Sequence, residues 1–106
     1  MTDVAPIGAL RHRLTLEHGG QDAAGETVWT PVDIVFAALA PTTPRERDSG
    51  GGAAGTVTHR IELRWRADVS SRDRLRLGER IFRILTAHDL DETRRRLVVL
   101  AEEEGR

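Results

Sequence analysis

Histidine has the widest chemical repertoire of any side chain in this sequence, and the chain contains four: His12, His18, His59 and His88. An imidazole can bind a metal or transfer a proton near neutral pH. A zinc site needs several ligands at close spacing, but these histidines are scattered along a chain that has no cysteine. His12 and His59 occupy positions expected to face inward on strands, where a hydrogen-bonded histidine is the simpler interpretation. We therefore expect no metal site.

Three other patterns resemble functional motifs only in composition. The acidic cluster at residues 89–92 lacks the glycine that a calcium loop needs for its sharp turn. The glycines at 50–52 are followed neither by a Lys-Ser/Thr pair nor by a helix that could bind phosphate. Ser49, Ser70 and Ser71 fall in expected loops without a nucleophile elbow. The sequence therefore predicts no catalytic residue, no cofactor and no enzymatic activity.

Arginine is the remaining distinctive residue, because every basic side chain is arginine and lysine is absent. The net charge of −1 argues against a general nucleic-acid binder, but residues 1–59 carry −3, residues 60–83 carry +4 and residues 84–106 carry −2. Genomic codon bias is one explanation for the missing lysine. The other is that planar, bidentate guanidinium groups join carboxylates across subunit interfaces. The candidate subunit-interface arginines are Arg60, Arg64, Arg66, Arg74 and Arg76.

Alternation with period two predicts the strands that must carry these side chains. Residues 57–66 read V-T-H-R-I-E-L-R-W-R, with the apolar positions on one face and mainly arginine on the other. Residues 10–17 alternate in the same way, and a polar turn is expected at 19–25. Pro31 indicates an edge or a bend, because proline cannot donate to a ladder. Further strands are expected at residues 28–30, 34–40, 74–77, 80–86 and 94–103.

Several short strands separated by turn signals predict an all-β fold, a small antiparallel β-barrel or sandwich of about six or seven strands. The 106 residues suit one domain, with an N-terminal arm at 1–9, the barrel at 10–103 and a C-terminal tail at 104–106. No apolar stretch is long enough to span a membrane. The expected core comprises Leu14, Leu16, Phe36, Ile61, Leu63, Trp65, Leu75, Leu77, Phe82, Ile84, Val99 and Leu100.

Residues 42–56 form a long loop that is rich in glycine and has no apolar side chain larger than alanine. Loops of this length inside a small domain tend to be functional or disordered. We expect this loop to be the least ordered segment of the free protein and to become ordered against a neighbour. Its charged stretch could form one helical turn, and it supplies the candidate channel or neighbour contacts Arg45, Glu46, Arg47 and Asp48.

A series of segments, taken in order over residues 8–103, carries a family resemblance. The segments are G-A-L-R-H-R-L-T-L (8–16), V-W-T-P-V (28–32), F-A-A-L-A-P (36–41), T-H-R-I-E-L-R-W-R (58–66), G-E-R-I-F-R-I (78–84), and D-E (91–92) followed by R-R-R-L-V-V-L (94–100). Together they resemble the head–tail joining proteins of long-tailed phages and phage-like gene transfer agents, also called head-closure or stopper proteins.

The resemblance implies a structural connector in the neck of a virion or phage-like particle, assembled in the bacterial cytoplasm. Family members are small β-barrels that form a ring below the portal, retain packaged DNA and offer the docking surface for the tail. The implied partners are further copies of the chain, about six or twelve in a closed ring, a portal-side adaptor, a tail terminator or tail tube protein, and double-stranded DNA passing without sequence reading. In the family the long loop can project toward the channel, and here residues 42–56 lack the bulk for a hydrophobic plug.

Two other functions remain open at this point. The first is a tail-terminator or tail-tube component, which belongs to the same kind of particle. The second is a stand-alone SH3-like or OB-like nucleic-acid module, whose DNA affinity would fall steeply with salt. Aromatic side chains usually flank the basic groove of such a module, but Trp65 and Phe82 are expected to lie in the core.

Overall fold

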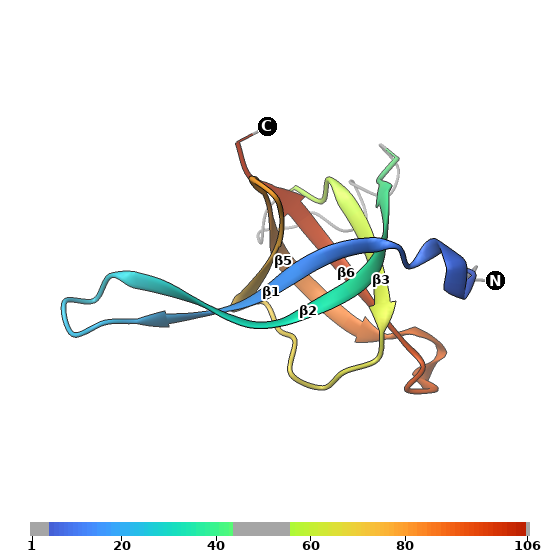
Figure 1. Ribbon diagram of the computed structural model, residues 1–106, viewed down its shortest axis with the longest axis horizontal. Coiled ribbons are helices and arrows are strands. Elements are labelled where there is room, and N and C mark those ends of the chain that lie inside the picture. The colour runs from blue at the N-terminus through green and yellow to red at the C-terminus, as the bar shows by residue number, and fades with distance from the viewer. Residues whose placement is uncertain (1–4, 44–55, 106) are drawn as a thin grey trace.

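Six antiparallel strands close into a barrel in the computed structural model of the chain, which describes residues 5–43 and 56–105 (Figure 1). The strands are β1 (His12–Gln21), β2 (Thr27–Pro41), β3 (His59–Arg64), β4 (Asp73–Leu77), β5 (Arg80–Asp89) and β6 (Arg96–Glu103). Around the barrel they follow the order β1-β2-β3-β6-β5-β4, and β4 pairs with β1 to close it. The predicted all-β barrel is confirmed. Two short 3₁₀ turns, η1 (Ile7–Ala9) and η3 (Leu90–Glu92), precede β1 and connect β5 to β6.

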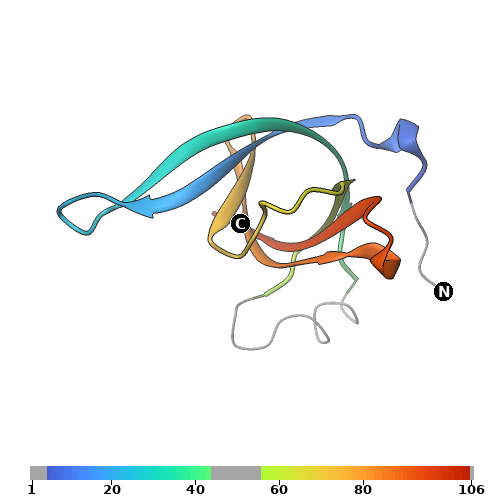
Figure 2. The same ribbon diagram turned by 90° about the horizontal axis from the view of Figure 1, so that it is seen from below.

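The β1–β2 hairpin is longer than the sequence predicted. The residues expected to open a turn, Gly19 and Gly20, instead pair with Trp29 and Val28, and the turn is confined to the residues between Gln21 and Thr27. The hairpin therefore projects well beyond the barrel, as both views of the ribbon show (Figures 1 and 2). Pairing shifts between Leu16 and Glu17, where Glu17 lies opposite Pro31. The bend predicted at this proline is thus a β-bulge on β2.

The core lies inside the barrel and is built from alternate positions of the strands. Most of the predicted core residues are fully buried, and Phe82 is the largest of them. Val35 and Ala37 are buried as well. The buried cluster consists of Leu14, Leu16, Val35, Ala37, Ile61, Leu63, Leu75, Phe82, Ile84, Leu97, Val99 and Ala101.

Phe36 is the main error in the predicted core, because 51% of it is exposed. The apolar run at 34–40 carries no polar alternation, so the sequence does not indicate which parity faces inward. Two smaller corrections concern half-buried residues: Trp65 and Leu77 only pack against the margin of the core, and Leu100 points away from it. His12, expected to face inward, is exposed near the start of β1.

The described part of the N-terminal arm contacts the outside of the barrel at Ala5 and covers an outward-facing position of β3. The amide of Ala5 donates to a carboxylate oxygen of Glu62, and Arg96 of β6 donates to the carbonyl of Ala5. Glu62 is consequently only 1% exposed, although its position in the strand predicted a solvent-facing side chain. No helix among residues 5–43 and 56–105 is long and apolar enough to cross a membrane.

Candidate assembly surface

Many arginines on the outside of the barrel bind carboxylates, in most cases on a neighbouring strand. Within the described residues, seven arginines form ion pairs with acidic side chains. They include four of the five candidate interface arginines: Arg60, Arg66, Arg74 and Arg76. The structure therefore gives these four a partner inside the chain, and their role between subunits stays a prediction.

Arg74 and Arg76 of β4 converge on Glu17 of β1. The Nε of Arg74 donates to Glu17 over 2.6 Å, and Arg76 lies 3.6 Å from the other carboxylate oxygen. The guanidinium of Arg74 also stacks over the Trp29 ring, 4.2 Å from its centroid, which is a favourable cation–π geometry. Glu17 is only 6% exposed as a result. This cluster joins β4 to the β1–β2 hairpin where the strands close the barrel.

Arg66, just after β3, links the end of this strand to β2 through hydrogen bonds. Its guanidinium donates to Asp68 over 2.6 and 2.9 Å and to Asp33 of β2 over 3.0 Å. The hydrogen bond from Arg66 is the main cause that lowers the pKa of the Asp33 carboxyl, and it lowers the pKa of Asp68 as well. The pKa of Arg66 itself is raised, chiefly by Asp68. Arg66 therefore holds the end of β3 to β2 beyond the last paired residues.

Arg96 and Glu62 form a buried pair under the N-terminal arm. Arg96 donates to Glu62 and to the Ala5 carbonyl, and Arg60 adds a 3.3 Å contact to the second oxygen of Glu62. The side chains of Glu62 and Arg96 are 1% and 11% exposed. A buried charge needs such partners, because desolvation without them is costly. Both residues were visible in the sequence, but only the path of the arm makes them a buried unit.

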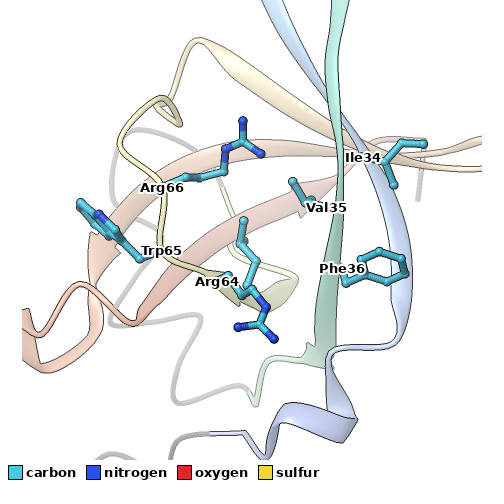
Figure 3. A pocket seen from close by; sticks show the side chains of 7 residues that line it. Ile34, Val35, Phe36, Arg64, Trp65 and Arg66 are labelled. Atoms are coloured by element: carbon cyan, nitrogen blue, oxygen red, sulfur yellow. The ribbon is translucent and has the colours of Figure 1, made fainter.

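An apolar stripe covers the outer face of β2. The stripe consists of Val32, Ile34 and Phe36, which are 40% to 51% exposed. Figure 3 shows the alternation that produces it, with Ile34 and Phe36 on one side of β2 and Val35 on the other. Exposed apolar patches of this kind mark interaction surfaces in soluble proteins. Next to the stripe lies a hollow lined by Ile34, Val35, Phe36, Leu63, Arg64, Trp65 and Arg66.

A second hollow carries three of the six described arginines that form no ion pair with the residues described. We call it the arginine hollow, and it is lined by Ile7, Arg64, Trp65, Arg94, Arg95 and Arg96. Arg64, Arg94 and Arg95 are exposed, and none of them pairs with an acid in 5–43 or 56–105. Arg64 is the fifth candidate interface arginine. Among the five candidates, it is the one whose guanidinium group has no acidic partner in the described part of the chain.

The other predicted features are placed as follows. No group of His, Asp or Glu in the described residues could hold a metal ion. His59 packs edge-on against Phe82 at 5.0 Å, and His18 lies 2.7 Å from Asp73. The candidate loop contacts Arg45, Glu46, Arg47 and Asp48 fall outside the described residues.

Comparison with known proteins decides the family. The family model of the phage head completion protein matches residues 5–104 of this chain. The chain belongs to this family. The predicted family resemblance is thereby confirmed, and membership assigns the protein a structural role connected with the phage head and a place in the virion.

Two solved structures are similar over nearly the whole chain. The solution structure of a protein from Shigella flexneri 2a shares 28% identity with a TM-score of 0.72, covering 95% of this chain and 98% of that one. A chain of the virion of a native gene transfer agent particle shares 29% identity with a TM-score of 0.64, covering 90% of this chain and 94% of that one. No curated protein sequence matches this chain.

Proposed function

We propose that the protein forms a ring that closes the filled head and receives the tail. The family match over residues 5–104 carries this proposal, and the similar chain in a gene transfer agent virion supports it. The geometry is suitable, because a closed ring needs two different complementary surfaces on each copy. The apolar stripe on β2 and the arginine hollow are two different surfaces available for contacts between copies. The ring would contact a portal-side adaptor on one side and a tail terminator or tail tube protein on the other.

Packaged double-stranded DNA would pass through this ring without being read. Contacts to phosphates carry no sequence information. In addition, seven of the arginines described here are paired with carboxylates within the chain, so these seven offer DNA no uncompensated charge. The protein would therefore act as a passive channel wall and as a structural connector.

Removal of the protein tests this function directly. In a strain lacking the chain we expect heads that fill and then leak their DNA, together with complete tails that stay detached. Electron microscopy of the lysate and nuclease sensitivity of the packaged DNA provide the two readouts. Fully joined particles from such a strain would rule out the proposal. Heads that keep their DNA but carry tails of irregular length would indicate a tail terminator.

The long loop provides a second test of the same function. We propose that the charged residues of this loop contact the channel or a neighbouring protein, because the loop is long, rich in glycine and has no large apolar side chain. The double variant Arg45→Ala and Arg47→Ala should reduce DNA retention or tail attachment while the melting temperature of the free protein stays unchanged. If the free variant instead loses thermal stability, the loop supports the barrel and this assignment is wrong. Hydrogen exchange adds a check: the amides of residues 44–55 should gain protection only in the particle, whereas the Thr42 amide already donates to the Thr58 carbonyl.

A further inference from the structure

The molecule presents its acidic hairpin tip and its arginine hollow at opposite ends. The β1–β2 turn lies at one end of the long axis, and η1 and the β5–β6 connection lie at the other in both views (Figures 1 and 2). The principal extents are 46 × 28 × 25 Å, so the long axis is more than one and a half times either of the others. The tip of the hairpin therefore cannot reach the hollow of its own chain.

The hairpin tip is an ordered surface that carries negative charge. The carboxylate of Asp22 accepts hydrogen bonds from the amides of Ala24 and Glu26, so the turn is built around this side chain. Glu26 is exposed and forms no ion pair with the residues described. Two residues further along, in β2, Val28 is 45% exposed. The tip thus combines an available carboxylate with an apolar side chain.

The arginine hollow has the complementary composition. It holds about 460 Å³, enough room for several side chains. Arg96 is occupied by Glu62, whereas Arg64, Arg94 and Arg95 line the hollow without an acidic partner among the described residues. Ile7, at 56% exposure, and the half-buried Trp65 provide apolar surface next to these guanidinium groups.

We propose that the hairpin tip of one copy sits in the arginine hollow of the next copy. Glu26 then faces the free guanidinium groups, and Val28 is covered by Ile7 and Trp65. This inference rests on the ring proposed above and names the contact that builds it. Because the two surfaces differ and lie at opposite ends, the contact is heterologous and can repeat from copy to copy until a ring closes. Charge complementarity would select this pairing over tip-to-tip and hollow-to-hollow contacts, which bring like charges together.

Cysteine cross-linking in assembled particles tests the contact, because the chain has no cysteine of its own. The double variant Glu26→Cys and Arg95→Cys, treated with a short bismaleimide, should give a ladder of dimers, trimers and larger multimers. Each single variant is the matched control and can give dimers at most. A cross-link within one copy is excluded by the distance between the two ends. Particles that are joined and retain DNA but give no ladder would overturn the contact while leaving the proposed function intact.

Exchange of the charges provides an independent test. Glu26→Arg alone and Arg95→Glu alone should each cause a several-fold loss of joined particles, and the double variant should restore them. Glu79→Arg is the control, since Glu79 is also an exposed acid, lies in the β4–β5 turn and is outside both surfaces. All variants should keep the melting temperature of the free protein. If Arg95→Glu reduces DNA retention and Glu26→Arg does not repair it, the hollow binds DNA phosphates and the proposal is wrong.

Discussion

Phe82 and Phe36 show how differently single side chains on the two faces of the barrel are used. Phe82 is fully buried, and its ring meets the ring of His59 at an interplanar angle of 78°. Phe36 lies on the outer face of β2 with half of its surface exposed. The two residues have the same chemistry, so they form a natural pair for separating stability from assembly.

Phe82→Ala should lower the free energy of unfolding by about 3–5 kcal/mol, because it removes a buried ring and leaves a cavity. Phe36→Ala is the matched control and should change it by less than about 0.5 kcal/mol, as is usual for surface positions. Urea unfolding followed by tryptophan fluorescence measures both values. Equal losses for the two variants would show that Phe36 is also part of the core.

Glu62→Ala should cost roughly 3 kcal/mol, near the lower end of the range for breaking a buried ion pair, because Arg96 keeps its bond to the Ala5 carbonyl. The same variant removes the acceptor of the Ala5 amide, so this amide should lose protection from hydrogen exchange. Glu102→Ala removes the more exposed pair with Arg83 and should cost only about 0–1 kcal/mol. An undisturbed Ala5 amide in Glu62→Ala would show that the arm is held by other contacts.

The carboxyl of Asp33 should titrate below its ordinary pKa of 3.8, and Arg66→Gln should return it toward that value. Its pKa is lower in the folded state, so the interaction stabilises the fold above the unfolded pKa and is lost as the pH falls through the folded pKa. The expected loss therefore lies in the acid range below pH 3.8. NMR titration of the Asp33 carboxyl carbon measures this shift. An ordinary pKa for the Asp33 carboxyl in the parent protein would mean that Arg66 does not bind Asp33 of β2 in solution.

At the scale of elements, the β1–β2 hairpin depends on a close approach at Gly19. A Cβ built at this position would lie 2.7 Å from the Arg72 carbonyl oxygen and 2.9 Å from the Trp29 ring. The amide of Gly19 also donates to that same carbonyl. The neighbouring Gly20 has open space around it. The base of the hairpin therefore tolerates a side chain at one glycine and not at the other.

Gly19→Ala should destabilise the protein by about 1–3 kcal/mol, the usual cost of overpacking, since backbone at Arg72 must move. Gly20→Ala is the control, and by restricting the unfolded chain it should be neutral or stabilise by up to about 1 kcal/mol. Thermal unfolding of the two variants gives the comparison. A destabilisation at Gly20 as large as that at Gly19 would contradict the packing described for the hairpin.

At the scale of the whole molecule, barrel closure leaves the outer face of β2 as the main apolar surface outside the core. The stripe of Val32, Ile34 and Phe36 packs against nothing in the described part of the chain that would bury it. Backbone pairing along this part of β2 is discouraged by Pro31 and the bulge. We therefore expect a neighbour to cover the stripe through side chains and not by extending the sheet.

Replacement of Val32, Ile34 and Phe36 by threonine should leave the midpoint of urea unfolding within the error of the parent protein. The same triple variant should yield fewer joined particles, because the surface covered on assembly loses apolar area. A triple threonine replacement of the buried Leu14, Leu16 and Leu75 is the contrasting control and should prevent folding. If the outer variant assembles as well as the parent, the stripe is not an interface.

The sequence by itself determined the strands and the all-β class, because the alternation of side chains is a local property with a period of two. Residues 57–66 became β3 and its flanks, and residues 74–77 became β4 with little change. The outward orientation of the arginines could also be predicted, because outward positions alternate with the apolar ones. Whether each arginine is free to bind a partner could not be predicted.

Only the tertiary structure decided what each outward position meets. Glu17 finds Arg74, and Glu62 finds Arg96 and Ala5, across separations of 57, 34 and 57 residues. Local alternation contains no information about such pairs, because they depend on which strands become neighbours when the barrel closes. The same closure chose Val35 and Ala37 over Phe36 for the core, in a run where every residue is apolar and parity alone cannot distinguish inside from outside.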